Sequence, residues 1–448
     1  MKILFVENRY KTYFWEQIAK ELSKHGHEIF WLIQNHTFAP AFANVYKVPY
    51  PATKLQLENE EDSQSIFDFI QTTDRIINYF NGANHHYSYY YKEFMKIITD
   101  VKPNLVIGES TLFHELMIID ICKKNNILYL HPSSTSYPIG RFSFFAYDTK
   151  EPFNGSNEIL SDEECDLLIQ NISDRKIVPD YMKKVERTNS SYPTAGSIRD
   201  KWTIMSSFFK GEIYNTPSPL RKLAQDLKVK NTLRKWDKLA ESSNQKLPTK
   251  NIILYPLQMQ PEANLDVWGN QFRNQTQLAK ELAAALPEDW HLVIKTNPKS
   301  KYEMNEALLQ VVKNTNNIIP LHSNTPMKDI FDLSTLVVTV TGTVAIECIL
   351  VSKPLGLLGP SVVKGFNGCN ILQNPKEINN VISLTKNNQF TPANINDKRN
   401  LIKKLVASSY KGLITDPVSN PNCLQQDNLD LIVQAILDAG LKEYIYEN

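Results

Sequence analysis

Short apolar runs alternate with segments of helical periodicity in both halves of this 448-residue chain. Near the start, the strand-like run KILFVEN precedes a segment with apolar residues at helical spacing, which ends at Gly26, and a second run, EIFWLIQ. A β-α-β succession of this kind opens a doubly wound parallel sheet. The same alternation begins again with NIILYPL and continues to PLGLLG. We therefore expect an α/β protein with two Rossmann-like domains.

Changes in composition along the chain predict the domain boundaries. We expect an N-terminal Rossmann-like domain over residues 1–150 and a second Rossmann-like domain over residues 246–390. Residues 151–245 are polar and punctuated by prolines, so we interpret them as a helical insertion or linker. Residues 391–448 are expected to form helices that pack back on the N-terminal domain. A length of 448 residues exceeds one compact core, which agrees with two domains.

Composition excludes several classes of protein. A net charge of +1 gives no reason to expect a nucleic-acid partner. The five cysteines are far apart and form no CxxC pair, which argues against a disulfide framework or a structural zinc site and favours a reducing cytoplasm. The chain start lacks the features of a signal peptide, and no run reaches about 18 apolar residues. We expect a soluble, cytoplasmic protein.

Residues 336–354, LVVTVTGTVAIECILVSKP, predict a buried strand, a tight turn and an apolar helix. The turn residues Thr341, Gly342 and Thr343 direct backbone N–H groups to one spot, where the helix dipole favours an anion. Glu347 lies about one turn into the helix, where a carboxylate can accept ribose hydroxyls. The pattern indicates a nucleotide site. The alternative is an ordinary βα turn whose glutamate caps a neighbouring group.

Two further groups end the predicted strand HLVIK. The ammonium of Lys295 can neutralise a phosphate, and Asn297 can donate to a ribose or phosphate oxygen. One βα unit separates them from the Thr-Gly-Thr turn, so we expect both motifs on the same rim of one sheet. The alternative for Lys295 is an ordinary surface lysine.

The segment YPLQMQPEAN follows the first strand of the second domain. Loops at the carboxyl ends of parallel strands form the ligand crevice in such sheets. Glu262 is a candidate nucleophile or base at an anomeric carbon, and Gln258 and Gln260 are candidates for binding substrate. The alternative is a solvent-exposed loop acid.

In the first domain, the run VIGES ends a predicted strand at Glu109, and HPSSTSYPIGRF forms the next loop. We expect Glu109, His131 and Arg141 to face the ligand cleft, with Glu109 as an acid or base and Arg141 gripping a substrate carboxylate. The alternatives are a helix-capping acid, a satisfied histidine and a surface arginine.

Other motifs bear on partners. Residues 221–239 hold seven Lys or Arg against two Asp, with leucines and Trp236 interspersed. This stretch is either a solvated helix face or a contact with an anionic membrane surface, so peripheral association with the inner membrane stays open. The chain lacks HExxH, DxD, GxGxxG and GxxxxGK[ST] motifs, which counts against common metal sites, dinucleotide dehydrogenases and P-loop enzymes.

The motifs YPLQMQPEAN, LPEDWHLVIKTNP and VTGTVAIECILVSKP occur in the order seen in bacterial capsule polysaccharide biosynthesis proteins. Over residues 250–360 the chain resembles the retaining β-Kdo transferases of capsule and O-antigen assembly, where Kdo is 3-deoxy-D-manno-oct-2-ulosonic acid. Two positions depart from the pattern. Asn297 stands where relatives often have His before the proline, and Glu262 stands where the loop acid is often Asp.

The resemblance implies a GT-B fold that uses a CMP-activated ulosonic acid, with the nucleotide held by the second domain. It places Lys295, Asn297, Thr341–Thr343 and Glu347 in the nucleotide site and an acid at Glu262. It also implies a glycan or glycolipid acceptor and no metal or cofactor beyond the donor. Two alternatives remain: a UDP-sugar-dependent transferase or epimerase on the same architecture, and a scaffold protein of polysaccharide assembly without turnover.

Overall fold

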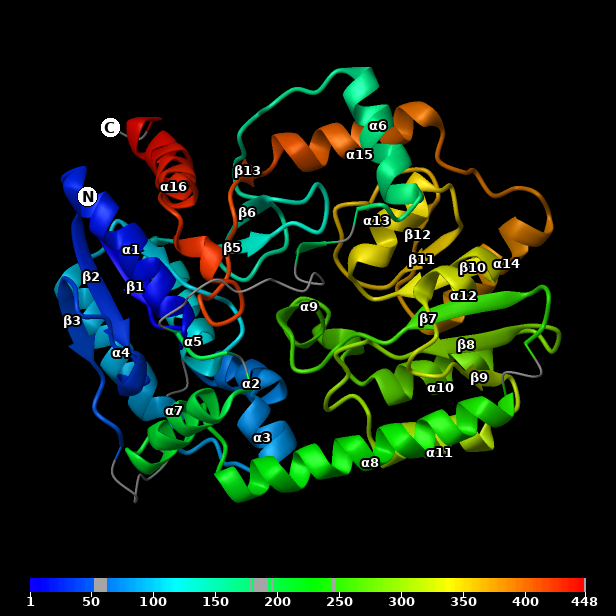
Figure 1. Cartoon of the computed structure of the whole chain (residues 1–448), viewed down its shortest axis with the longest axis horizontal. Coiled ribbons are helices and arrows are strands. Elements are labelled where there is room, and N and C mark those ends of the chain that lie inside the picture. Colours follow the sequence, from blue (N-terminus) through cyan, green and yellow to red (C-terminus); the bar gives the residue numbers. More distant parts are fainter. Residues whose placement is uncertain (52–62, 178, 181–191, 195, 244–246, 447–448) are drawn as a thin grey trace. The chain divides into compact units, whose positions relative to one another are not determined.

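The computed structural model describes residues 1–51, 63–177, 179–180, 192–194, 196–243 and 247–446 (Figure 1). The chain divides into two compact units. Unit 1 comprises Met1–Leu160, Ile177–Arg221 and Lys403–Asn448, and unit 2 comprises Ser161–Lys176 and Lys222–Ile402. The chain thus changes unit after residues 160, 176, 221 and 402.

Unit 1 contains a seven-stranded sheet in the order β13-β6-β5-β4-β1-β2-β3. Neighbouring strands are parallel from β5 to β3, and β6 and β13 extend the sheet in antiparallel fashion. Successive strands run outward from β1 to β3, and the chain then returns to place β4 on the other side of β1. The switch point of a doubly wound sheet therefore lies between β1 and β4. The strands are β1 (Lys2–Val6), β2 (Glu28–Ile33), β3 (Asn44–Lys47), β4 (Leu105–Ile107), β5 (Leu128–Ser134), β6 (Arg141–Ala146) and β13 (Tyr410–Lys411).

Helices cover both faces of this sheet. α1 and α16 share one core with alternate residues of β1, β2 and β4, whereas α4 and α5 pack together on the opposite face (Figure 1). The apolar positions Phe14, Ile18 and Leu22, which repeat at helical spacing in α1, are all fully buried. The helices are α1 (Lys11–Lys24), α2 (Gln64–Thr73), α3 (Arg75–Phe80), α4 (Tyr87–Val101), α5 (Phe113–Lys124), α7 (Ile198–Phe209) and α16 (Gln426–Tyr446), with the 3-10 turns η1 (His36–Phe38) and η7 (Pro421–Leu424).

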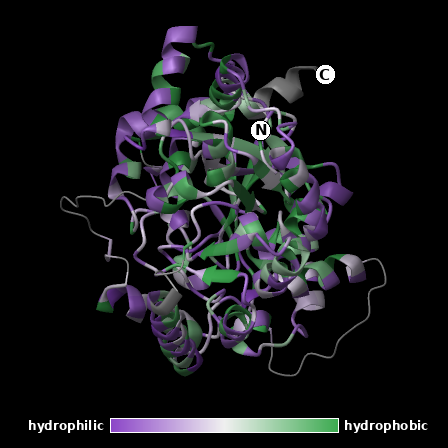
Figure 2. Ribbon diagram, turned by 90° about the vertical axis from the view of Figure 1, so that its right-hand side faces the viewer, coloured by the Kyte–Doolittle hydropathy of each residue, from purple (hydrophilic) through white to green (hydrophobic). Residues whose placement is uncertain are grey.

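Unit 2 contains a six-stranded parallel sheet in the order β12-β11-β10-β7-β8-β9. Its strands are almost continuously apolar, as expected for parallel strands that are buried on both faces, and they are coloured hydrophobic in Figure 2. The switch point lies between β7 and β10. The strands are β7 (Ile252–Pro256), β8 (His291–Lys295), β9 (Ile318–Pro320), β10 (Leu336–Thr339), β11 (Leu355–Leu357) and β12 (Cys369–Ile371).

The core of unit 2 joins one face of its sheet to α8, α10, α11 and α14. α13 packs against β10 and β11 and also contacts α6. The helices are α6 (Asp162–Ser173), α8 (Pro219–Ser243), α9 (Ala263–Asp266), α10 (Gln275–Ala285), α11 (Glu306–Asn314), α12 (Met327–Leu333), α13 (Thr343–Leu350), α14 (Ile378–Lys386) and α15 (Ile395–Ala407), with the 3-10 turns η5 (Asn270–Phe272) and η6 (Pro375–Glu377). Two α/β units, one with a parallel sheet and one with a sheet that is parallel except for β6 and β13, confirm the predicted fold class.

Residues 151–245, expected to form a helical insertion, do not make a body of their own. Their helices are divided, since α7 belongs to unit 1 whereas α6 and most of α8 belong to unit 2. The reason is a small number of apolar anchors in a polar sequence: Trp236 of α8 is fully buried in the core of unit 2. In the C-terminal segment, α16 packs on α1, and the boundary between the units falls inside α15. None of the described helices has the length and apolarity needed to cross a membrane.

Candidate functional site

The candidate site of unit 2 lies at the carboxyl edge of its sheet, where β7 and β10 are neighbours. The amide Nε2 of Gln258, after β7, donates to the hydroxyl Oγ1 of Thr341, after β10, at 2.8 Å. The same hydroxyl lies 3.4 Å from the carbonyl oxygen of Asn264. The loop after β7 and the turn after β10 are therefore joined at the switch point, where doubly wound sheets bind ligands.

Gly342 gives this turn its shape. Its φ of +100° and ψ of 172° suit glycine, and a Cβ there would lie 3.2 Å from Nε2 of Gln258. Thr343 begins α13, so the positive end of the helix dipole lies beside the exposed Gly342. The oxygen Oε1 of Gln258 is buried and has no hydrogen-bond partner among the described residues. At this turn, the start of α13 favours an anion, and it lies beside the oxygen of Gln258, a hydrogen-bond acceptor without a partner among the described residues.

Gln260, predicted to bind substrate, instead supports the loop after β7. Its Nε2 donates to Oδ1 of Asp266 at 2.8 Å and to the carbonyl of Arg273 at 3.0 Å, and its Oε1 accepts from Gln275 at 3.1 Å. Burial raises the pKa of Asp266, and Arg273 opposes this shift. Since the hydrogen bonds of Gln260 are used within the loop, its role is to hold the loop in shape.

Glu262 is placed by this scaffold. Its backbone N–H donates to Oδ2 of Asp266 at 3.0 Å, immediately before α9. Its carboxylate accepts from Nδ2 of Asn264 at 3.2 Å, and the side chain is half-buried. Asn264 also reaches Thr341 through its carbonyl. The structure therefore brings the loop of Glu262 and the Thr-Gly-Thr turn together, as the sequence predicts.

Lys295 lies on the same edge, but its ammonium is directed elsewhere. Nζ donates to the carbonyl of Thr296 at 3.0 Å and to that of Ser323, after β9, at 2.9 Å. Because β9 flanks β8 on the side opposite β7, these bonds lead away from β10. Burial lowers the pKa of Lys295, and Asp237 opposes this shift. Asn297 accepts from the N–H of Lys299 at 2.8 Å and shapes a local turn.

Glu347 has a partner that the sequence did not reveal. Its Oε2 accepts from Nη2 of Arg175, in the turn after α6, at 2.8 Å. The guanidinium of Arg175 also lies 5.0 Å from the ring centroid of Phe331. A ribose bound by Glu347 has to share or replace this ion pair.

In unit 1, Glu109 follows β4 at the switch point of that sheet. Its Oε1 accepts from Nζ of Lys11 at 2.5 Å, and its carboxylate is 22% exposed. The neighbouring Glu115 is fully buried and accepts from the N–H groups of Thr111 and Leu112, each at 2.8 Å. Burial, helped by the charge of Glu109, raises the pKa of Glu115 to about 7. Glu109 thus keeps solvent access, whereas Glu115 is a buried acid that titrates near neutrality.

His131 and Arg141, expected to face a ligand cleft, serve the fold of unit 1 instead. His131 lies in mid-strand, stacks on Phe145 at 5.2 Å and contacts the carbonyl of Thr149 at 3.1 Å. Burial lowers its pKa to about 3, so the imidazole is neutral at physiological pH. Arg141 is 6% exposed and binds Glu158 at 2.8 Å and the carbonyl of Ser409 at 2.8 Å. The expectation failed because β5 extends to Ser134 and returns as the antiparallel β6, where an open loop was predicted.

A buried polar cluster that the sequence did not indicate lies at the switch point of unit 1. Glu212 is fully buried, and its Oε1 accepts from Nε2 of Gln34, after β2, at 3.1 Å. Asn215 donates from Nδ2 to Oε1 of Gln34 at 3.1 Å and lies 3.0 Å from Nδ1 of His114. The segment around Asn215 therefore bonds to residues that follow β2 and β4 at this edge of the sheet.

Two arginines converge on this segment. Arg9, after β1, and Arg75, at the start of α3, donate to the carbonyl of Asn215 at 2.9 and 2.5 Å. Burial lowers the pKa of Arg75 to about 9, so it remains charged at neutral pH. The polar residues after KILFV were the sequence signal that could have indicated this cluster. Their partner Asn215 lies about 200 residues further along the chain, so the sequence did not reveal the contact.

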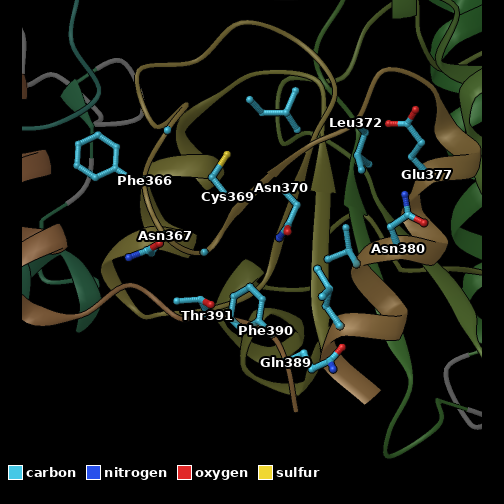
Figure 3. A pocket seen from close by; sticks show the side chains of 15 residues that line it. Phe366, Asn367, Cys369, Asn370, Leu372, Glu377, Asn380, Gln389, Phe390 and Thr391 are labelled. Carbon is cyan, nitrogen blue, oxygen red and sulfur yellow. The ribbon is translucent and has the colours of Figure 1, made fainter. Parts of the chain in front are cut away.

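A separate cavity of about 600 Å³ runs along the outer strand β12 of unit 2 (Figure 3). Its lining includes Phe366, Asn370, Asn380, Gln389 and Phe390, and none of the predicted site residues. Among the residues that the structure describes, no group of three or more His, Cys, Asp or Glu is arranged to hold a metal ion.

No protein-family model matches the chain, and no curated protein matches it. Among solved structures, the chain is similar to a UDP-GlcNAc 2-epimerase from Methanocaldococcus jannaschii, with 12% identity, a TM-score of 0.28 and coverage of 90% of this chain and 99% of that one. It is also similar to the calicheamicin glycosyltransferase CalG4, with 14% identity, a TM-score of 0.30 and coverage of 91% and 94%.

A third similar structure is KpsC, a β-Kdo 2,7 transferase from Thermosulfurimonas dismutans. The identity is 10%, the TM-score is 0.35, and coverage is 78% of this chain and 89% of that one. At these TM-scores the likeness carries no argument about function, and the fold assignment stands on the strand order of the two sheets.

Proposed function

We propose that this protein is a glycosyltransferase that uses a nucleotide-sugar donor, with the nucleotide bound by unit 2. The observation that carries the proposal is the switch point between β7 and β10. Three features meet there: the Gln258–Thr341 hydrogen bond, the glycine-shaped start of α13, and the oxygen Oε1 of Gln258, which has no partner in the described part of the chain. This combination suits a phosphate on backbone N–H groups and a base or ribose donor on the glutamine oxygen.

In this proposal the donor is a CMP-activated ulosonic acid such as Kdo, and the acceptor is a surface polysaccharide or glycolipid. The support is the resemblance of residues 250–360 to retaining β-Kdo transferases, together with the position of Glu262 in the loop that reaches Thr341. Glu347 is the proposed ribose ligand, reached by displacing or sharing Arg175. Lys295 is proposed to shape the site through its bonds after β9.

The proposed reaction retains configuration through two displacements. In the first, a carboxylate oxygen of Glu262 bonds to the anomeric carbon while the bond to the CMP phosphate breaks, and the N–H groups at the start of α13 stabilise the departing anion. In the second, an acceptor oxygen bonds to the anomeric carbon, the bond to Glu262 breaks and the hydroxyl proton passes to a base. Within unit 1, Glu109 is the acid or base that the sequence predicts, and its side chain keeps solvent access.

Thermal unfolding with CMP, UDP and GDP tests the nucleotide assignment. A ligand that binds only the folded state raises the unfolding temperature, so CMP is expected to stabilise the protein more than the other two. Gln258→Leu should lose this effect, whereas Gln310→Leu, at an exposed position of α11, should keep it. Stabilisation by UDP alone would favour the UDP-sugar transferase or epimerase, and no stabilisation by any nucleotide would favour the scaffold.

Glu262→Gln tests the nucleophile. Removing an attacking group acts on the chemical step, so we expect kcat for donor hydrolysis and transfer to fall at least about 100-fold while CMP binding stays unchanged. Glu281→Gln, at an exposed position of α10, is the matched control and should retain wild-type rates. Near-normal transfer by Glu262→Gln at saturating donor would refute the assignment.

A further inference from the structure

The helix α7 of unit 1 is amphipathic in the reverse of the usual sense. Ile198, Trp202, Met205 and Phe209 are spaced four, three and four residues apart, so they fall within about 60° of one another around the helix. Three of them are strongly exposed: Ile198 by 88%, Trp202 by 66% and Phe209 by 73%. The apolar stripe of α7 therefore faces outward.

The polar side of the same helix is buried. Asp200 is 8% exposed and accepts from the N–H of Gly196 at 2.7 Å, and Ser207 is fully buried. Both lie about 180° from the apolar stripe. A helix stabilised only by its own unit buries its apolar face, so this orientation indicates that the stripe serves an external partner.

The charges around the stripe indicate which partner. Arg199, Lys201 and Lys210 are exposed, whereas the single acid of α7, Asp200, is turned inward. The outward side of α7 thus combines tryptophan, phenylalanine and isoleucine with cations. This combination suits a helix that lies in the headgroup region of an anionic bilayer.

The basic stretch 221–239, which the sequence singled out for a membrane, has a different arrangement. Trp236 is fully buried in unit 2 and donates from its indole nitrogen to the carbonyl of Leu321 at 2.8 Å. The only aromatic residue of the basic stretch is therefore unavailable to lipid. α7 is the better candidate because its aromatic residues are exposed.

We propose that α7, labelled in Figure 1, docks unit 1 on an anionic membrane surface. Its exposed side chains Trp202 and Phe209 would insert among the lipids. This inference goes beyond the proposed transfer reaction and does not depend on it. A protein held in this way works beside lipid-linked molecules without any spanning helix.

Vesicle co-sedimentation of the full chain tests the proposal. Wild-type protein should bind phosphatidylcholine vesicles that contain phosphatidylglycerol, bind pure phosphatidylcholine more weakly and lose affinity in high salt. The double variant Trp202→Ser/Phe209→Ser should bind at least about tenfold more weakly, and Lys201→Glu should weaken binding to the anionic vesicles alone.

The control is Ile159→Ser, which removes an apolar side chain of unit 1 that is 89% exposed but lies outside α7. It should bind vesicles as the wild type does. Circular dichroism and unfolding temperature verify that each variant is folded, and hydrolysis of a soluble donor should be the same in all of them. Equal vesicle binding by wild type and double variant, or no binding by wild type, would overturn the proposal. It would also be overturned if light scattering showed that the stripe joins two copies of the chain.

Discussion

Glu115 shows how burial changes the chemistry of a single residue in unit 1. It stands at the start of α5, where it accepts hydrogen bonds from Thr111, Leu112 and Asn8. These bonds favour the charged form, but burial and the nearby Glu109 outweigh them and raise its pKa to about 7. The sequence indicated Glu109, the more accessible acid of this pair, and the structure adds the buried Glu115.

The raised pKa of Glu115 predicts a pH dependence of stability. Between pH 4.5 and about 7 the folded protein keeps a proton on this carboxyl that the unfolded chain releases, so the stability that it contributes is lost as the pH rises through that window. The loss is about 3 kcal/mol at most. As the pH rises from 4.5 to 7.5, we expect the unfolding temperature of Glu115→Gln to increase relative to that of wild type, because only wild type loses this contribution.

Comparing the variant with wild type at each pH cancels the contribution of other groups. These include His131, whose lowered pKa removes stability as the pH falls below its unfolded value. Glu28→Gln, at an exposed position of β2, should follow wild type throughout. A Glu115→Gln profile parallel to that of wild type would contradict the prediction.

A buried arginine such as Arg141 can either bind a substrate carboxylate or hold the fold together. Its contacts indicate the second role. Lysine keeps its charge but loses the planar fork that bonds Glu158, Ser156 and the carbonyl of Ser409 together. We expect Arg141→Lys to destabilise unit 1 by about 2 kcal/mol without changing the KM for donor. Urea unfolding and steady-state kinetics measure the two effects.

The control for Arg141 is Lys411→Ala, which removes the more exposed cation of Glu158. Its effect on stability should be small, as for most exposed ion pairs. If Arg141→Lys kept wild-type stability but raised the KM for donor, the prediction that Arg141 binds a substrate carboxylate would be supported instead.

At the scale of elements, the turn between β10 and α13 needs glycine for two reasons. The backbone conformation of Gly342 is unfavourable for other residues, and the proposed phosphate site lies at this turn. Gly342→Ala places a side chain in a backbone region that is almost restricted to glycine, at a cost of about 1–3 kcal/mol. It also pushes against Nε2 of Gln258. We therefore expect lower stability and a loss of CMP affinity of about tenfold, which corresponds to about 1.4 kcal/mol. Calorimetric titration with CMP measures the affinity.

Gly365→Ala is the control that separates backbone strain from an effect on CMP binding. Gly365 has a φ of +90° but open space around the position of a Cβ. Its substitution should strain the backbone of unit 2 while leaving CMP affinity intact. Equal losses of affinity in both variants would show that the Gly342 effect is only structural.

At the scale of the whole molecule, the two units are interleaved along the chain. Helices α6 and α8 lie in sequence between parts of unit 1, yet they complete unit 2. Trp236 is the main anchor of α8 in that unit, since its ring is fully buried and its indole N–H is satisfied by Leu321. Unit 2 therefore depends on a segment that the sequence indicated was a helical insertion or linker.

Trp236→Ala is expected to destabilise unit 2 by about 3–5 kcal/mol, because it removes a large buried side chain and leaves a cavity. Trp202→Ala, which truncates a largely exposed ring in α7, should change stability little. Hydrogen exchange resolves the two units, so faster exchange in Trp236→Ala should be confined to unit 2. Uniform acceleration across both units would contradict this expectation.

The strands and helices that border the candidate site could be predicted because their signals are local. The periodicity of α1, the apolar run of β10 and the Thr-Gly-Thr turn each lie within a few residues of chain. Contacts between distant segments could not be predicted in this way. The carboxylate of Glu347 meets Arg175 after α6, and the two arginines of unit 1 meet Asn215, because folding joins segments far apart in sequence.

By itself, the sequence determined the parallel strands of two α/β sheets and the strand ends at which polar residues gather, since side-chain spacing and backbone preference act over short distances. Only the tertiary structure decided which of those polar groups remain available. It engaged Arg141, Gln260 and Lys295 in internal bonds, kept Gln258 and Gly342 at the switch point and turned the apolar side of α7 outward. The physical reason is that a hydrogen bond or a buried face depends on partners that only the folded chain supplies.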